Sequence, residues 1–250
     1  MALEHKYLSD KSDPRKVADL CGRFYLQYAR SYLDQHCFDY DYYSNIFVSL
    51  GRARSCFVFI QNHELILETE IITGYVYYTM RTETAVKRAE EKWRKAISLL
   101  QESKQKIGPK KTAAFFHRIR QNQANIDFVR TNYFEAKEKY LRCVAYYLKH
   151  DNYTKVCDIK KALGDCCRAL GQYQEAAQHY LEYLEYEELS TTDQEFKQKV
   201  RDDILTNLLE DIREDRMGSL FESAVEFLHY QTDRSPEEIL NMILKFSEKQ

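Results

Sequence analysis

The side chains able to do chemistry are scattered along this 250-residue chain. Cys166 and Cys167 are adjacent, but neighbouring residues of a helix point about 100° apart and chelate one ion poorly. His63 and Glu64 begin like a zinc-protease helix, yet Leu67 occupies the position of the second histidine. The glycines are isolated and form no phosphate-binding loop. The sequence therefore predicts no catalytic residue, no metal site, no cofactor and a protein that is not an enzyme.

Turn-forming residues are scarce, which favours long helices over sheets. Only 7 glycines and 3 prolines occur in the chain, well below average usage. Apolar residues recur at the three- and four-residue spacing of amphipathic helices. The predicted helices cover about residues 14–36, 43–62, 64–80, 84–106, 113–129, 133–149, 155–169, 173–188, 194–215, 219–230 and 236–248.

Residues 157–190 contain the clearest motif, a predicted pair of short antiparallel helices. Gly164 lets the first helix approach its neighbour closely, and Gly171 supplies the positive φ that ends that helix. Ala176 is small where the second helix crosses the first, and Tyr180 fills the groove beside it. Such a hairpin cannot bury its apolar face alone and must stack on similar units.

These residues, with Leu163 before Gly164 and Tyr173 before Ala176, resemble the tetratricopeptide repeat, a helix hairpin of 34 residues. An earlier copy follows when the motif is shifted by 40 residues, which aligns Tyr140 with Tyr180. A third copy is aligned through Ala89, Trp93 and Ala96 on its second helix, with Tyr77 at the position of Gly164.

The resemblance implies an all-α fold, a right-handed superhelix of antiparallel helix pairs. Repeats are expected at about residues 70–103, 117–150 and 157–190, within a central region 63–190. Residues 1–62 form a helix pair that is either a degenerate repeat or a cap, and residues 191–250 form capping helices, because such arrays need polar outer faces at their ends.

In tetratricopeptide proteins the first helix of each pair lines a concave groove, so the resemblance implies a peptide-binding site on those helices. Polar and aromatic side chains there can hydrogen-bond an extended peptide and cover its apolar groups. The implied groove residues are Tyr75, Tyr78, Arg81, Arg118, Gln121, Asn122, Asn125, Val129, Lys161, Asp165 and Arg168.

Charge is unevenly distributed along the chain. Residues 87–120 contain 11 basic and 3 acidic residues, and residues 182–226 contain 14 acidic and 5 basic ones. The basic band could dock an acidic peptide, a phosphate or RNA, attract the acidic region, or be a solvated helix face. Its patch residues are Lys87, Arg88, Lys92, Arg94, Lys95, Lys110 and Lys111.

Seven cysteines at irregular spacing argue against a disulfide framework and indicate a reducing compartment, the cytoplasm, with the nucleus as alternative. No stretch approaches the roughly 20 apolar residues of a membrane span. The predicted function is an adaptor or assembly subunit that binds a peptide of a partner protein. The alternatives are RNA or polyphosphate binding by the basic band, and a structural subunit that self-associates or belongs to a larger complex.

Overall fold

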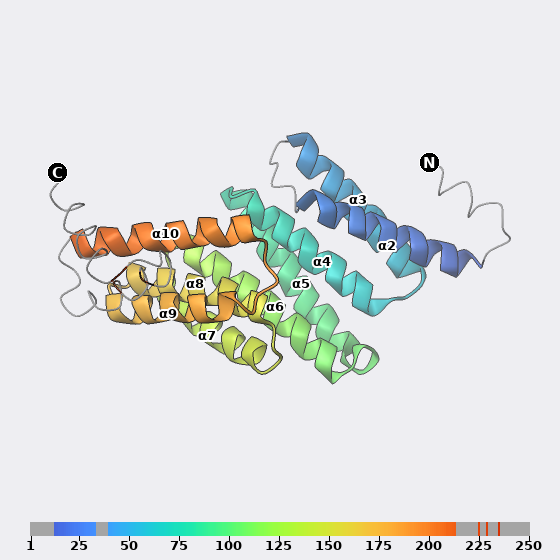
Figure 1. The fold of residues 1–250 in the computed structure, drawn as a ribbon. Helices are drawn as coiled ribbons and strands as arrows, with labels where there is room; N and C mark the ends of the chain where they lie inside the picture. The colour runs from blue at the N-terminus through green and yellow to red at the C-terminus, as the bar shows by residue number, and fades with distance from the viewer. Residues whose placement is uncertain (1–12, 34–39, 214–224, 226–228, 230–234, 236–250) are drawn as a thin grey trace. The chain divides into compact units, whose positions relative to one another are not determined.

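The computed structural model describes residues 13–33 and 40–213, together with residues 225, 229 and 235 (Figure 1). Within these residues every regular element is an α-helix and no strand occurs, which confirms the predicted all-α class. The helices are α2 (Pro14–Leu33), α3 (Tyr40–Phe59), α4 (His63–Thr79), α5 (Glu83–Ile107), α6 (Pro109–Val129), α7 (Tyr133–Leu148), α8 (Tyr153–Ala169), α9 (Tyr173–Glu187) and α10 (Gln194–Arg213).

Most helix boundaries lie within three residues of those predicted from the sequence. The main difference is α6, which begins at Pro109 instead of near residue 113, because proline suits the first turn of a helix. The predicted helices at 219–230 and 236–248, and with them much of the predicted C-terminal cap, lie outside the described residues.

Five turns between helices share one backbone geometry. Each contains a residue with φ between 53° and 73°, and the next helix begins two positions later. These residues are Gln61, Arg81, Thr131, Asp151 and Gly171. The positive φ predicted for Gly171 is therefore confirmed, and four side-chain-bearing residues adopt the same conformation despite the cost of a Cβ there.

The spacing of these turns gives the repeat length. Thr131, Asp151 and Gly171 follow one another at intervals of twenty residues, and the same interval separates Gln61 from Arg81. One hairpin with its connector therefore spans forty residues, longer than the 34-residue unit that the motif resembles. Between Arg81 and Thr131 the spacing widens, because α5 has 25 residues and α6 has 21.

The chain divides into two compact units, Met1–Asn122 and Gln123–Gln250, with the boundary inside α6. In the first unit α2 packs on α3, α3 on α4 and α4 on α5. In the second unit α7 packs on α8, α8 on α9 and α9 on α10. From α2 to α5 and from α7 to α10, each helix therefore packs on the one that follows it in the chain.

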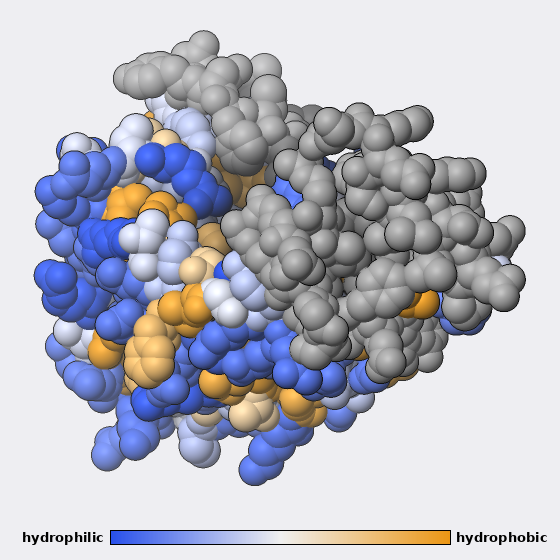
Figure 2. All heavy atoms as spheres, turned by 90° about the vertical axis from the view of Figure 1, so that its left-hand side faces the viewer, coloured by the Kyte–Doolittle hydropathy of each residue, from blue (hydrophilic) through white to orange (hydrophobic). Residues whose placement is uncertain are grey.

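Each unit has its own hydrophobic core. Ile46, Leu50 and Phe57 of α3 lie at the centre of one core in the first unit. In the second unit one cluster joins α7 to α8 and another joins α8 to α9 and α10. On the face shown in Figure 2, hydrophobic residues form small separate groups between hydrophilic ones wherever the surface is not drawn in grey.

The α8–α9 hairpin is closed by a contact between a glycine and an aromatic ring. Gly164 and Tyr180 are so close that a Cβ added to the glycine would lie 2.2 Å from a ring carbon. The Tyr180 hydroxyl donates a hydrogen bond to Oδ1 of Asp165 at 2.8 Å. The close approach predicted for Gly164 and the burial predicted for Tyr180 are both confirmed.

Related contacts occur elsewhere. Forty residues earlier, the Tyr140 hydroxyl donates to Oδ1 of Asn125 at 2.6 Å, and both Tyr140 and Ala124 are buried. Between α4 and α5 the indole N–H of the fully buried Trp93 donates to the Ile71 carbonyl at 3.1 Å. In each hairpin an aromatic side chain of the second helix thus has its polar atom satisfied by the first helix.

The sequence alignment of the α4–α5 copy is wrong in register. It placed Tyr77 at the position of Gly164, but the residue against Trp93 is Gly74, whose added Cβ would lie 2.3 Å from the indole nitrogen. Gly74 and Gly164 each lie five residues before the last residue of their helix. Trp93 lies further along its helix than Tyr180 does, and an alignment anchored on these two aromatic residues therefore slips by three positions.

The described helices contain no segment that is both long enough and apolar enough to cross a bilayer. The described cysteines are all free thiols, and four of them, Cys143, Cys157, Cys166 and Cys167, are buried.

We predict that Gly164→Ala destabilises the protein. The new methyl group overlaps the Tyr180 ring, and overpacking of this kind costs about 1–3 kcal/mol. Gly51→Ala is the matched control, because Gly51 is also helical but has open space around it; replacing it should leave stability unchanged or raise it by about 0.5–1 kcal/mol. Urea unfolding of both variants measures the difference, and equal midpoints would contradict the assigned contact.

Candidate functional site

One carboxylate joins the first helices of the hairpins in the first unit. Oε1 of Glu68 on α4 accepts hydrogen bonds from Arg30 on α2 and from Arg118 on α6, the latter at 3.1 Å. Lys111 on α6 also pairs with Glu64 on α4 at 2.7 Å. Glu64 pairs with Lys111, and Glu68, one turn later on α4, pairs with Arg118, which lies later on α6; the two helices therefore run in the same direction. Side by side, α2, α4 and α6 form what we call the first-helix surface.

An aromatic and cationic cluster lies at the C-terminal end of α4. The Arg81 guanidinium lies 4.5 Å from the Tyr78 ring centroid and donates to the Tyr78 hydroxyl at 3.0 Å. The Tyr75 ring lies 6.2 Å from that of Tyr78 and is 40 % exposed. Burial raises the pKa of Tyr78 despite the nearby Arg81 charge. The cluster therefore offers an exposed ring and a cation, and the buried Tyr78 holds that cation in place.

The other implied groove residues on α6 differ in accessibility. Gln121 is half-buried, whereas Asn122 is buried. Val129 is 39 % exposed. Asn125 accepts a hydrogen bond from the Tyr140 hydroxyl. Asn125 thus serves the packing of α6 against α7.

The implied groove residues on α8 contact α10. Arg168 donates to Asp211 at 2.7 Å, to Asn207 at 2.9 Å and to Glu210 at 3.0 Å. Lys161 pairs with Asp203 at 2.6 Å. Because Asp211 is buried, removing Arg168 would leave its carboxylate without this partner. Arg168 and Lys161 therefore anchor α10, and Asp165 accepts the Tyr180 hydroxyl.

The implied groove residues consequently divide into two sets, one in each unit. The first unit contains Tyr75, Tyr78, Arg81, Arg118, Gln121 and Asn122, and the second contains Asn125, Val129, Lys161, Asp165 and Arg168.

A buried carboxylate organises part of the basic band. Glu70 on α4 has a completely buried side chain, and its oxygens pair with Arg54 on α3 at 2.6 Å and with Lys92 and Lys95 on α5 at 3.0 and 3.5 Å. Burial raises the pKa of Glu70, but hydrogen bonds from Arg54 and Lys92 and the nearby lysine charges outweigh it, so that the pKa lies below its ordinary value.

Next to this carboxylate the surface is hollowed. Tyr77, Arg88, Glu91, Lys92 and Lys95 line an open hollow of about 310 Å³, which we call the basic hollow. The Arg88 guanidinium lies 5.8 Å from the centroid of the Tyr77 ring.

The remaining predicted patch residues lie outside the lining of the hollow. Lys87 pairs with Glu83 at 2.7 Å, and Lys111 pairs with Glu64. Arg94 and Lys110 are exposed.

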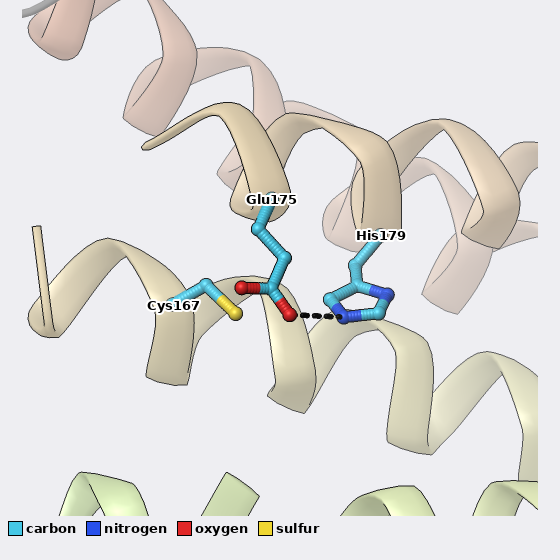
Figure 3. A group of neighbouring side chains, drawn as sticks. All are labelled: Cys167, Glu175 and His179. Carbon is cyan, nitrogen blue, oxygen red and sulfur yellow. Dashed lines mark ion pairs between the residues drawn. The ribbon is translucent and has the colours of Figure 1, made fainter. Parts of the chain in front are cut away.

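A third cluster joins α8 to α9 in the second unit (Figure 3). The thiol of Cys167, the carboxylate of Glu175 and the imidazole of His179 place one ligand atom each within 4.8 Å of the others. Burial raises the pKa of the Cys167 thiol to about 11. Burial also lowers the pKa of His179, in spite of its hydrogen bond to Glu182, so its ring is neutral near pH 7.

The third cluster was not predicted from the sequence. Sequence reasoning tested Cys167 against its neighbour Cys166 and found no metal pair. The available signal was the spacing of Glu175 and His179, four residues apart on one helix face, combined with a cysteine shortly before the Gly171 turn. The turn folds these three residues onto one side of the hairpin.

We predict that Glu70 links stability to acid pH. A carboxylate with a lowered folded-state pKa contributes stability that is present at neutral pH and is lost as the pH falls below about 4.5 and through the folded-state pKa. Glu70→Gln should cost about 1.5–3 kcal/mol at pH 7 and flatten the acid limb of the stability curve. Glu83→Gln, whose side chain is 81 % exposed, should change stability by less than about 1 kcal/mol. Chemical unfolding across this pH range measures both, and parallel acid limbs for wild type and Glu70→Gln would contradict the prediction.

No protein-family model matches the chain, and no curated protein matches its sequence. Its function is therefore inferred from its own side chains and their geometry.

Proposed function

We propose that the chain is a tetratricopeptide-like interaction protein, an adaptor or assembly subunit that works in the cytoplasm or nucleus and makes or breaks no bond. Its hairpins would continue into a right-handed superhelix, and its partner would contribute an extended peptide segment. Two features support this proposal: the recurring turn geometry of the hairpins, and the side-by-side arrangement of α2, α4 and α6 through Glu68.

The observation that carries the proposal is the cluster of Tyr75, Tyr78 and Arg81 at the end of α4. Tyrosine and arginine dominate the energetics of protein interfaces, because they combine a large apolar area with hydrogen bonding. The Tyr78 contact already orders the Arg81 guanidinium, so less side-chain entropy is lost when a peptide carboxylate or carbonyl binds it. The exposed ring of Tyr75 would cover an apolar side chain of the same peptide.

Within this proposal the implied groove residues have different roles. Tyr75, Arg81 and the half-buried Gln121 would contact the peptide. Lys161 and Arg168 would instead hold α10 in place, since their charged groups already pair with acidic residues of that helix.

The test compares two double variants in a peptide-display selection. Peptides enriched on the wild-type chain should bind Tyr75→Ser with Arg81→Gln about thirtyfold more weakly or worse, the loss expected when one interface hot spot of about 2 kcal/mol is removed. Phe134→Ser with Arg142→Gln is the matched control, because it removes an exposed aromatic ring and an exposed cation from α7. Equal binding by the two double variants would rule out the α4 cluster as the peptide site.

A second candidate function is the binding of phosphate groups, as in RNA, at the basic hollow. Arg88, Lys92 and Lys95 line the hollow together with Glu91, and Arg54 lies next to it against Glu70. The Tyr77 ring could stack on a base beside the phosphate. This local excess of positive charge is the specific observation that favours the second candidate.

Salt dependence tests the second candidate. With a single-stranded RNA of random sequence, Arg88→Gln with Lys95→Gln should weaken binding and reduce the slope of log affinity against log salt by about 1.4, or about 0.7 for each lost phosphate contact. Lys149→Gln with Lys199→Gln makes the same charge change at exposed lysines of the second unit and should leave the slope unchanged. Identical slopes for the two double variants would exclude the basic hollow as an RNA site.

A further inference from the structure

We propose that Cys167, Glu175 and His179 bind a thiophilic divalent cation, with Zn²⁺ as the natural occupant, between α8 and α9. The three side chains point toward one another from the two facing helices (Figure 3), and their ligand atoms lie within 4.8 Å of each other. Thiolate, imidazole and carboxylate are the ligand types that Zn²⁺ takes in proteins. The site is independent of the peptide and RNA surfaces proposed above.

The hydrogen bonding of His179 leaves one ring nitrogen available for a cation. Nδ1 lies 3.2 Å from Oε2 of Glu182, and the ammonium of the buried Lys160 pairs with that same oxygen. Because a carboxylate oxygen only accepts hydrogen bonds, Nδ1 carries the proton of the neutral ring and Nε2 has the lone pair. Histidine ligands of metals are held in the same way, with the second ring nitrogen donating to a carboxylate.

The lone pair on Nε2 of His179 is buried and faces a negative group. Among the described residues Nε2 has no hydrogen-bond partner, and the nearest oxygen of Glu175, Oε1, lies 3.9 Å away. Two acceptors that face each other in a buried place repel unless a positive charge lies between them. In tetrahedral zinc sites, nitrogen and oxygen ligands at about 2.0–2.1 Å from the metal lie about 3.4 Å apart. The His179–Glu175 pair is near that spacing, and the three ligand atoms, which lie within 4.8 Å of one another, would close around the cation.

Lys137 contacts both Glu175 and the Cys167 thiol, so its ammonium would shift away from the sulfur as the cation enters. Its ammonium on α7 donates to Oε2 of Glu175 at 2.6 Å and to Gln172 at 2.8 Å. Oε1, the oxygen nearer His179, is a different atom and keeps its lone pairs for a cation. Ligating carboxylates commonly accept such an outer hydrogen bond on their second oxygen.

Binding at this site would join the two helices of the hairpin. The Cys167 thiol would lose its proton to solvent as the sulfur–metal bond forms, and a water molecule would complete the tetrahedron as the fourth ligand. The side chain of Glu175 is 43 % exposed, which gives the cation a path from solvent.

Co²⁺ binding to the purified, reduced 250-residue chain tests the proposal, because Co²⁺ takes tetrahedral zinc sites and a thiolate ligand gives a charge-transfer band. We expect one Co²⁺ per chain, with that band, and its displacement by Zn²⁺. Cys167→Ser should abolish the band. Cys166→Ser is the matched control: its thiol is equally buried but packs in the α7–α8 cluster, so the band should persist.

Folding is checked separately by far-ultraviolet circular dichroism. Should Cys167→Ser lose helicity, Glu175→Gln is the second variant, because its partly exposed side chain can change without disturbing the core; it should weaken Co²⁺ binding at least tenfold at unchanged helicity. The proposal is overturned if the wild-type chain gives no thiolate band, if Cys166→Ser and Cys167→Ser lose it equally, or if folded Glu175→Gln binds Co²⁺ as tightly as wild type.

Discussion

The fold depends on one recurring contact, in which an aromatic side chain of the second helix lies against a small residue of the first and has its polar atom satisfied there. Tyr180 reaches Asp165 over Gly164, and Trp93 reaches a backbone carbonyl over Gly74. The large ring adds buried apolar area to the hairpin, while the hydrogen bond offsets the cost of burying a hydroxyl or indole N–H. The small residue sets the distance between the helices.

The second constraint is that carboxylates buried between helices are matched locally by cations. Glu70 is surrounded by arginine and lysine from α3 and α5. In the second unit Glu187 is buried and accepts hydrogen bonds from Arg201 at 2.6 Å and from the Tyr183 hydroxyl at 3.0 Å. Asp211 is matched by Arg168 in the same way. Some charged residues of the basic and acidic regions therefore form ion pairs within their own units, and these ion pairs join neighbouring helices.

Sequence reasoning predicted the described helices, the Gly171 turn, the close approach at Gly164 and the burial of Tyr180, because each depends on a local pattern of residue types. It could not predict that Lys161 and Arg168 pair with α10, because the sequence pattern of a charged helix face is the same whether that face contacts solvent or another helix. It also missed Cys167 with Glu175 and His179, because those ligands meet only after the hairpin closes. Local periodicity is thus enough to predict the helices, whereas the contacts of individual side chains are known only from the folded structure.

The turn residues with positive φ explain why the recurring hairpins are difficult to recognise in the sequence. Thr131 and Asp151 adopt the same backbone conformation as Gly171, although a side chain there costs about 1–2 kcal/mol. Helix packing on both sides therefore holds the turn in this conformation, and a glycine is not required there. A hairpin built in this way keeps its shape without a glycine at the turn, so the recurring unit is recognised from the backbone geometry where the residue types do not show it.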